Sequence, residues 1–539
     1  MGRRGYPITR RDFLSLAGGA VAGAALGALP ASAGETCGKP KYGGHFIMAE
    51  RRHPLTLDPH RPQDETIDAM HALLMYNGLI DRGAPPQVKI YPSLAREWDI
   101  SPDGRTYLFS LHRGVKFHHG KELTSADVKY SLDRIRDPKT RARRMRDLIL
   151  VDSVDAADRY TVRMRLKEPY GAFLHKLTVR VAPIIPEGSD YKEGVPPPGT
   201  GPFVFKEWKQ DQYVNYLRHK NYFEEGLPYV DALTVRGVPD GAVRFTALRT
   251  GEIHWIAGIP LNRTTALKKD PPKGVVIYVS YPIGRQAIVF NLRRSVGEKP
   301  NPFSDVRVRQ AVAYAIDKKE LLQGTNYGYG NVMDGQFYDR DSPWWVDVPD
   351  YQQDLGKARA LLAEAGYPNG LQSVLLTQKD ERWRTPAEII ASQLKRAGID
   401  LRLSIHDVAE HTRLMLRTHE FFVTFFGHSF REDPDDGYYL FLHSQSSANA
   451  SGYADPEYDR LVEEARRRTA LEERKAVYKK VVQKLRADVP FISAVSNRLP
   501  YAWRDFVKCD CAPGEENCWG FGGWFIYAQG GAKRVWLDK

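Results

Sequence analysis

The sequence predicts an α/β fold, in which helices and strands follow one another in mixed order. Apolar residues at helical spacing end at glycines, segments with alternating apolar residues follow them, and capping residues precede the helices. The 539 residues, of which 42% are hydrophobic, are enough for roughly two or three domains with large cores.

The first clear elements lie in the N-terminal third of the chain. Residues 106–115 alternate between apolar and polar side chains and turn at Gly114, which predicts a strand. Thr124 then offers a hydroxyl group for a helix N-cap, and Asp127 stands three residues later, as in a capping box. We therefore expect a helix to begin at this point.

The alternation is most regular further along the chain. An apolar face over residues 355–365 predicts a helix that stops at a glycine, and residues 371–376 predict the strand that follows. Thr385 as N-cap and Pro386 at the first helical position predict the start of the next helix. Residues 401–405 then alternate as a strand, which completes the α/β pattern.

Two charged helices and a buried strand are predicted near the C-terminus. One helix opens at Asp455-Pro456 and the other close to Thr469, and residues 489–495 read as the strand. A proline-rich stretch at residues 196–199 separates an earlier region from a new one.

The first residues have the order of an export signal. Arg10-Arg11 precede an apolar, glycine- and alanine-rich stretch from residue 16 to 29, and Ala31-Ser32-Ala33 follows. This order predicts a signal peptide over residues 1–33, and the arginine pair indicates the twin-arginine route. The stretch lacks the Leu, Ile and Val density of a membrane anchor. We expect cleavage near Ala33 and a periplasmic protein.

The charge pattern excludes several classes of function. The formal net charge of +12 is spread along the chain and mixed with Asp and Glu, which favours a solvated surface. The sequence has no nucleic-acid-binding motif, no P-loop and no dinucleotide-binding glycine motif. We expect no nucleic-acid partner and no cofactor.

Four cysteines remain after the predicted cleavage, and their even number in an exported chain suggests two disulfides. A bond between Cys509 and Cys511 would close a very tight loop. We therefore predict that Cys37 pairs with Cys509 or Cys511, and that Cys518 pairs with the other. A Cys-x-Cys metal site is disfavoured because no set of four Cys or His ligands has the usual spacing.

Separated segments of the chain occur in the order typical of one protein family. They are Leu57-Asp58-Pro59, residues 94–98, 103–128, 199–203, 305–317 and 365–367, together with Asn291. With these segments the chain resembles the peptide/nickel family of solute-binding proteins, family 5, which includes dipeptide- and oligopeptide-binding proteins of ABC transporters. The resemblance extends over about residues 42–501.

The resemblance implies a bilobal periplasmic-binding-protein fold, with the ligand in a cleft that closes by hinge motion. Both ends of the mature chain would lie in one lobe, which would also bring Cys37 near the other cysteines. The implied divisions are lobe I at residues 34–80, 190–289 and 497–539, a subdomain inserted in it at 81–189, and lobe II at 290–496.

The function that the resemblance implies is capture of a peptide or another small polar solute and its delivery to an ABC permease. The expected protein is a monomer and not an enzyme, and its partners are this ligand and the permease. A secreted hydrolase is the alternative from another class. It would need a nucleophile, base and orienting acid that the sequence does not offer, since Gly427-His428-Ser429 has Arg431 where a nucleophile elbow needs glycine.

The resemblance also implies where the ligand lies. Relatives line the cleft with residues five to seven positions after the Asp of the Leu-Asp-Pro motif, and they hold a peptide amine with carboxylates in a Gly-Trp stretch that ends before a proline. Carried onto this chain, these positions and the family asparagine give the candidate ligand-binding residues Gln63, Asp64, Glu65, Asn291, His428, Ser429, Phe430, Arg431 and Asp433.

The second stretch departs from the pattern of the oligopeptide binders. Phe430 stands where they carry the aspartate that holds the amine, and Arg431 adds a cation beside it. An anionic, sugar-like or opine-like solute is therefore an alternative ligand, because a guanidinium pairs with carboxylates and Phe430 can stack. The alternative is that Arg431 pairs with Glu432 or Asp435 on a solvated turn.

Histidine pairs in the sequence do not predict a metal site. His118 and His119 are consecutive in an extended segment, so their side chains point to opposite faces. His406 and His411 are five residues apart and miss the spacing of a helical metal pair. We expect structural roles for these histidines.

Overall fold

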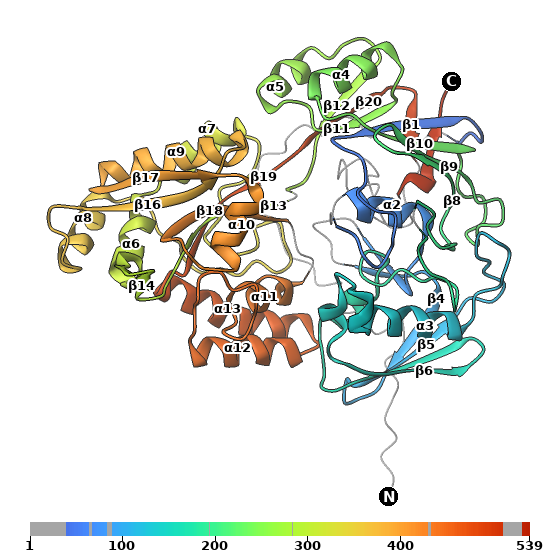
Figure 1. Cartoon of the computed structure of the whole chain (residues 1–539), viewed down its shortest axis with the longest axis horizontal. Helices are drawn as coiled ribbons and strands as arrows, with labels where there is room; N and C mark the ends of the chain where they lie inside the picture. Colours follow the sequence, from blue (N-terminus) through green and yellow to red (C-terminus); the bar gives the residue numbers. More distant parts are fainter. Residues whose placement is uncertain are drawn as a thin grey trace, which may run out of the picture. The chain divides into compact units, whose positions relative to one another are not determined.

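Strands from both ends of the chain and from its middle form the largest sheet, drawn blue, green and red in Figure 1. The computed structural model describes residues 39–63, 67–83, 89–192, 194–282, 284–429, 433–509 and 531–539. The sheet has the order β12-β20-β11-β1-β10-β9-β8. Its strands are β1 (His45–Glu50), β8 (Phe203–Lys209), β9 (Tyr213–Arg218), β10 (Ala232–Gly237), β11 (Trp255–Ala257), β12 (Val275–Val279) and β20 (Pro500–Arg504).

A smaller four-stranded sheet, with the order β4-β5-β7-β6, has a hydrophobic core of its own. It belongs to an inserted subdomain, by which we mean this sheet with helix α3 and the short 3-10 helix η3. The elements are β4 (Ala95–Ile100), β5 (Thr106–Leu111), α3 (Ser125–Arg136), β6 (Val151–Asp158), β7 (Thr161–Leu166) and η3 (Phe173–Leu177).

The second large sheet has five strands in the order β17-β16-β18-β13-β19, and most of the helices that the structure describes belong to it. We refer to this sheet with its helices as lobe II, and to the seven-stranded sheet with the inserted subdomain as lobe I. The strands are β13 (Gly284–Phe290), β16 (Leu371–Gln378), β17 (Ile399–His406), β18 (Val423–Ser429) and β19 (Phe491–Asn497). The helices are α6 (Val306–Ala315), α7 (Lys318–Asn326), α8 (Leu355–Glu364), α9 (Glu381–Arg396), α10 (Val408–Leu416), α11 (Tyr438–Leu442), α12 (Pro456–Arg467) and α13 (Leu471–Asp488).

Shorter elements complete lobe I and connect the strands of lobe II. In lobe I they are α2 (Ile67–Met75), β2 (Ile80–Arg82), β3 (Ile90–Pro92), α4 (Gly241–Thr250), α5 (Leu261–Lys269), β21 (Val507–Cys509), η7 (Ala532–Arg534) and β22 (Val535–Leu537). In lobe II they are β14 (Ser295–Val296), β15 (Lys299–Pro300) and the 3-10 helix η5 (Pro434–Asp436). None of the described helices is long and apolar enough to span a membrane.

The α/β fold class is confirmed, and so are most of the predicted helix starts. Thr124 is the N-cap of α3, and Asp127 completes the capping box. Asp455 caps α12, and Pro456 is its first residue. The strands predicted at residues 371–376 and 401–405 are parts of β16 and β17, which pair in parallel.

The predicted start of α9 is wrong. The helix begins at Glu381, four residues before Thr385, and it contains Pro386 in its interior. The reason is an earlier cap: the Asp380 side chain accepts a hydrogen bond from the backbone N–H of Arg382. Two plausible caps compete in the sequence, and the earlier one gains an additional turn of helix.

Two adjacent chain passes connect the lobes. β12 ends at Val279 and β13 begins at Gly284, and β19 leads into β20 through Arg498 and Leu499. The passes are hydrogen bonded to each other, because Ser280 N donates to Leu499 O over 2.9 Å and Leu499 N donates to Ser280 Oγ over 3.0 Å. A pair of short crossovers of this kind is where a hinge can act.

Cys509 is buried at the end of β21. Its predicted partners, Cys37 and Cys518, lie outside the described residues, and so do Cys511 and the predicted signal peptide. The disulfide pairing and the export signal therefore stay predictions.

His71 packs α2 against the seven-stranded sheet and gives a pH-dependent contribution to stability. Its side chain is 0% exposed, and Nδ1 shares a hydrogen bond with the hydroxyl of Tyr216 on β9. Burial, and to a smaller extent His53, lowers the pKa of His71 to about 3. The folded protein therefore keeps this imidazole neutral at pH values where the unfolded chain takes up a proton.

We expect protonation of His71 in the unfolded chain to lower the free energy of unfolding by about 2 kcal/mol when the pH is lowered from 7 to 5. The stabilisation is complete above the ordinary pKa of about 6.5 and is lost as the pH falls toward 3. Urea unfolding at both pH values, compared between the wild type and His71→Asn, measures the effect. An equal pH dependence for the two proteins would contradict the assignment.

Candidate functional site

The crossovers meet lobe II at one end of its five-stranded sheet. Gly284, the first residue of β13, is paired with Ser429 at the carboxyl end of β18 and with Asn497 at the end of β19. Ligands of open α/β sheets bind outside the carboxyl ends of strands. We call this sheet end, with the two crossovers, the lobe junction, and it is the candidate ligand site.

Aromatic and cationic side chains line the sheet at the junction. His428 is the register partner of Arg285, and its ring centroid lies 3.8 Å from that of Phe441. The Arg285 guanidinium lies over the Phe337 ring, 3.8 Å from its centroid, and donates to Phe337 O over 3.3 Å. The junction thus offers stacking surfaces and a buried positive charge.

Gly427 precedes His428 on β18 and shapes the opposite face of the sheet. Trp383 of α9 lies against it, and a Cβ atom at position 427 would come within 2.4 Å of Cη2 of the indole. The absence of a side chain lets Trp383 stack on Phe426, with ring centroids 6.1 Å apart and an interplanar angle of 17°. The glycine of the predicted ligand stretch therefore makes room for an aromatic residue from another element.

Asp433 is held by Arg474 of α13. Its side chain is 0% exposed, and Arg474 donates to both carboxylate oxygens over 2.6 and 2.7 Å. Burial on its own would raise the pKa of Asp433, but the Arg474 guanidinium outweighs this effect and lowers the pKa to about 2. Asp433 also accepts from Asp435 N, so in this structure it fixes the turn η5 and a solute amine would have to displace Arg474.

Asn291 lies at the other end of β13 from His428. Its side chain donates to the carbonyls of His419 and Phe421, each over 2.9 Å, and it is completely buried. The seven residues of β13 separate the two ends by about 20 Å. The structure therefore does not bring Asn291 together with the other candidate residues.

The remaining predicted positions are described only in part. Gln63 is exposed, and its backbone N–H donates to Asp68 Oδ2 over 2.8 Å. Ser429 is the last residue of β18. Asp64, Glu65, Phe430 and Arg431 lie outside the described residues, so their assignment stays a prediction.

A hydrogen-bond network around the crossovers was not predicted. The Tyr281 hydroxyl donates to Asp339 over 3.0 Å, and Asn331 donates to the same carboxylate over 3.2 Å. Arg498 of the second crossover donates to the side-chain oxygen of Asn331 over 3.3 Å. Burial raises the pKa of the Asp339 carboxyl above its ordinary value. The network links both crossovers to lobe II and positions the hinge.

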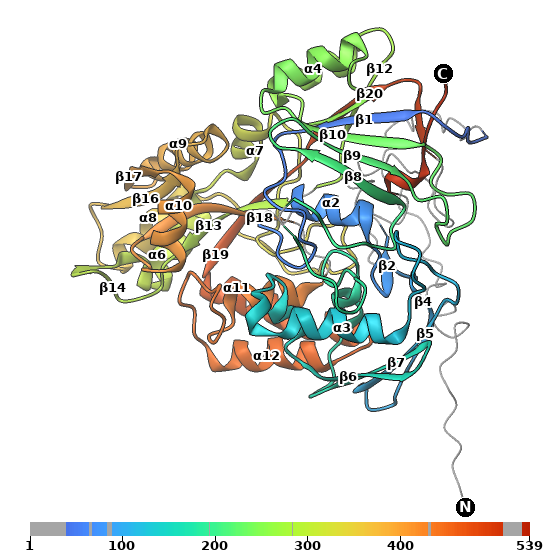
Figure 2. The ribbon, with the colours of Figure 1, turned by 45° about the vertical axis from the view of Figure 1, so that its right-hand side comes forward.

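A second unpredicted contact joins the inserted subdomain to lobe II, and Figure 2 shows α12 beside that subdomain. The Tyr170 hydroxyl donates to Asp435 over 2.7 Å, and the Lys176 ammonium group pairs with Asp436. Arg466 of α12 pairs with Asp435 over 3.0 Å. We call these residues the clamp, and they lie on segments far apart in sequence.

The hydrogen bonds of His118 agree with the structural role expected for it. His118 accepts from Gly199 N through Nδ1 over 3.2 Å, and its Nε2 pairs with Gly201 O over 3.1 Å, as expected for a structural residue. The part of the chain that the structure describes contains no group of three His, Cys, Asp or Glu side chains placed to hold a metal ion.

Comparison with known proteins identifies relatives over most of the chain. Residues 89–449 match the model of the bacterial extracellular solute-binding proteins, family 5. The glutathione-binding protein GsiB of Pectobacterium atrosepticum is 30% identical over 458 residues, which cover 82% of this chain and 87% of that protein. Heme-binding protein A of Haemophilus influenzae is 30% identical over 497 residues, covering 86% and 88%.

Solved structures show the same fold. The periplasmic binding protein DppA of Helicobacter pylori, in complex with the peptide STSA, superposes with a TM-score of 0.76 at 26% identity, covering 93% of this chain and 99% of that one. AgaA of A. tumefaciens R10, in complex with agropinic acid, superposes with a TM-score of 0.75 at 25% identity, covering 92% and 99%. The bilobal periplasmic-binding-protein fold predicted from the sequence is confirmed.

Proposed function

Because this chain belongs to family 5 of the bacterial extracellular solute-binding proteins, we propose that it captures a peptide or another small polar solute at the lobe junction and delivers it to the permease of an ABC importer. The observation that carries the proposal is the pair of hydrogen-bonded crossovers between two sheets, each sheet with its own core. This arrangement allows the lobes to rotate as rigid bodies and to enclose a ligand.

The finer features follow from the sequence patterns. The protein is exported through the Arg10-Arg11 signal, is cleaved near Ala33 and acts as a monomer in the periplasm. Cys37 pairs with Cys509 or Cys511, and Cys518 pairs with the other. Lobe I consists of residues 34–80, 190–289 and 497–539, with the subdomain 81–189 inserted, and lobe II is residues 290–496. One division differs from this: β13 belongs to the five-stranded sheet from Gly284 onward. We therefore propose that lobe II begins at Gly284 and not at residue 290.

A solute with an acidic group is the second candidate ligand. Arg474 already neutralises Asp433, so this aspartate is not free to hold a peptide amine. Arg285 is buried at the junction, and Arg431 lies in the predicted ligand stretch. Relatives named for glutathione or solved with agropinic acid bind molecules with carboxylate groups, which a guanidinium recognises in a bidentate geometry.

Thermal unfolding with a panel of solutes tests the proposal. A matching solute at about 100 times its Kd adds about 2.7 kcal/mol to the apparent stability. We expect acidic peptides such as glutathione, or opine-type acids, to raise the melting temperature, and we expect Arg431→Ala to abolish the shift. Arg402→Ala, an exposed arginine on β17, is the matched control and should keep it.

The panel also decides between the two ligand classes. If peptides shift the melting temperature whatever their charge and Arg431→Ala behaves like the wild type, the acidic-solute proposal fails and the peptide proposal stands. If no solute of either class binds while the protein is folded and monomeric, both fail. Mass spectrometry of what co-purifies from the periplasm then identifies the bound class directly.

A further inference from the structure

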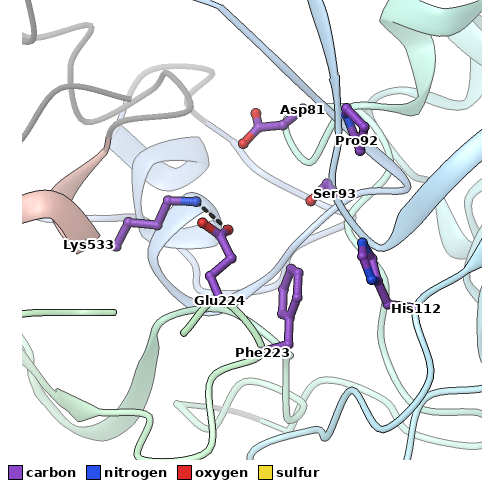
Figure 3. Close-up of a pocket in the computed structure, with 7 residues that line it drawn as sticks. All are labelled: Asp81, Pro92, Ser93, His112, Phe223, Glu224 and Lys533. Atoms are coloured by element: carbon purple, nitrogen blue, oxygen red, sulfur yellow. Dashed lines mark hydrogen bonds and ion pairs between the residues drawn. The ribbon is translucent and has the colours of Figure 1, made fainter. Parts of the chain in front are cut away.

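A cavity of about 200 Å³ lies away from the lobe junction, where the inserted subdomain meets the rest of lobe I (Figure 3). Its walls come from β2, from the end of β3 and the residue after it, from the residue after β5, from the loop after β9 and from η7. None of its lining residues is a candidate ligand residue. The volume corresponds to about seven water molecules, which is small for a drug-sized ligand.

Three polar side chains line this cavity with atoms that can form additional hydrogen bonds. Ser93 is only 7% exposed, and among the described residues its hydroxyl has no hydrogen-bond partner. Asp81 accepts one hydrogen bond, from Arg82 N over 2.8 Å, and has no salt bridge within the described ranges. The structure also gives the imidazole nitrogens of His112 no partner there. Asp81 and His112 are partly exposed, whereas a buried hydroxyl such as that of Ser93 calls for a ligand or ordered water.

The charged side chains that line the cavity are Asp81, Glu224 and Lys533, and when ionised they sum to a negative charge. Glu224 pairs with Lys533 over 2.5 Å and accepts from the Tyr222 hydroxyl over 2.9 Å, so these two opposite charges cancel (Figure 3). Burial, and next Arg96, lower the pKa of His112 below its ordinary value, so the ring is neutral near pH 7. The Asp81 carboxylate supplies the remaining negative charge; burial raises the pKa of this carboxyl above its ordinary value, and the nearby Lys533 ammonium group opposes that effect.

The walls are partly apolar. Phe223 and Pro92 line the cavity, and the Phe223 ring lies 5.8 Å from the His112 ring between their centroids. A cavity lined by an aromatic ring and a carboxylate favours an organic cation, because the ring attracts positive charge while its surface is apolar. A metal ion is disfavoured, since the described residues contain no three suitable ligand side chains close together.

We propose that this cavity is a binding site for a small organic ammonium ion, with Asp81 as the charge partner, Ser93 and His112 as hydrogen-bond partners and Phe223 as the aromatic wall. The ammonium group donates to the Asp81 carboxylate, and its alkyl part lies against Phe223 and Pro92. The site is independent of the solute at the lobe junction. A ligand of so few atoms binds weakly, with a Kd in the millimolar to high-micromolar range.

Saturation-transfer NMR on the full-length mature protein tests this site with ethylammonium as the probe and ethanol as its neutral counterpart. We expect ethylammonium to bind and ethanol to bind much more weakly. Asp81→Asn keeps the shape of the side chain and removes its charge, and it should weaken ethylammonium binding by at least about tenfold. Asp99→Asn, an exposed carboxylate on β4, is the matched control and should bind as the wild type does.

Several results would overturn the proposal. Equal affinity of the wild type and a folded Asp81→Asn variant would show that the carboxylate does not hold the cation. Equal affinity for ethanol would show an apolar cavity without charge recognition, and no ethylammonium binding to the wild type would show no site. If Asp81→Asn does not fold, Ser93→Ala decides: a severalfold loss of affinity supports the site, and an unchanged affinity contradicts it.

Discussion

Replacing Arg474 with alanine lowers the free energy of unfolding by about 3–5 kcal/mol, because the change leaves the Asp433 carboxylate buried without its partner. Both side chains are almost fully inaccessible, at 2% and 0% exposure, and they form two hydrogen bonds. The variant also loses the contact of the guanidinium with the Trp344 ring, 4.8 Å from its centroid. Urea or guanidinium unfolding at pH 7 measures the loss.

Two further variants serve as controls for the Arg474→Ala measurement. Arg384→Ala removes an exposed arginine that pairs with Glu388 one helical turn away and should cost less than about 1 kcal/mol. The double variant Asp433→Leu with Arg474→Met should recover most of the lost stability, because it removes both charges together. A loss below about 1 kcal/mol for Arg474→Ala would contradict a buried, mutually dependent pair.

Replacing Lys176 with methionine weakens solute binding roughly tenfold or more, although the side chain is not at the lobe junction. Lys176 is 2% exposed and pairs with Asp436 of lobe II and with Asp147, the latter over 3.3 Å. Burial opposes its charge, but Asp436 and then Asp147 keep its pKa above the ordinary value. Opening of the lobes breaks the pair with Asp436, so the variant populates the closed form less.

Calorimetric titration with the solute found in the panel measures this change, and Lys129→Met provides the control. Lys129 is exposed and pairs with Asp133 within α3, so its loss should leave the Kd unchanged. A folded Lys176→Met variant with the wild-type Kd would show that the clamp does not contribute to closure.

Local sequence signals predicted much of the fold correctly. The cap at Thr124 and the Asp455-Pro456 start are short-range features, since each depends on residues within one helical turn. The start of α9 was missed because Asp380 and Thr385 both satisfy the cap pattern and only the packed structure decides between them. The lobe organisation came from the family resemblance, because pairing of distant strands leaves no local signal.

The candidate site was less predictable, for the same reason. Asp433 lies in a stretch that resembles an amine-binding motif, but Arg474 on another helix takes its carboxylate. The clamp joins Tyr170 to Asp435, 265 positions later. Asn291 occupies a position that the family resemblance assigns to the ligand site, but its side-chain amide donates to main-chain carbonyls of a neighbouring loop. Contacts of such sequence separation become visible only when the fold is known.

Small-angle X-ray scattering with and without the matching solute tests hinge closure most directly. The crossovers and the clamp predict that the solute lowers the radius of gyration of the wild type, and that Lys176→Met without solute has a larger radius of gyration than the wild type without solute. A wild-type radius of gyration that does not change at saturating solute, combined with an identical value for Lys176→Met, would contradict capture by closure of the two lobes.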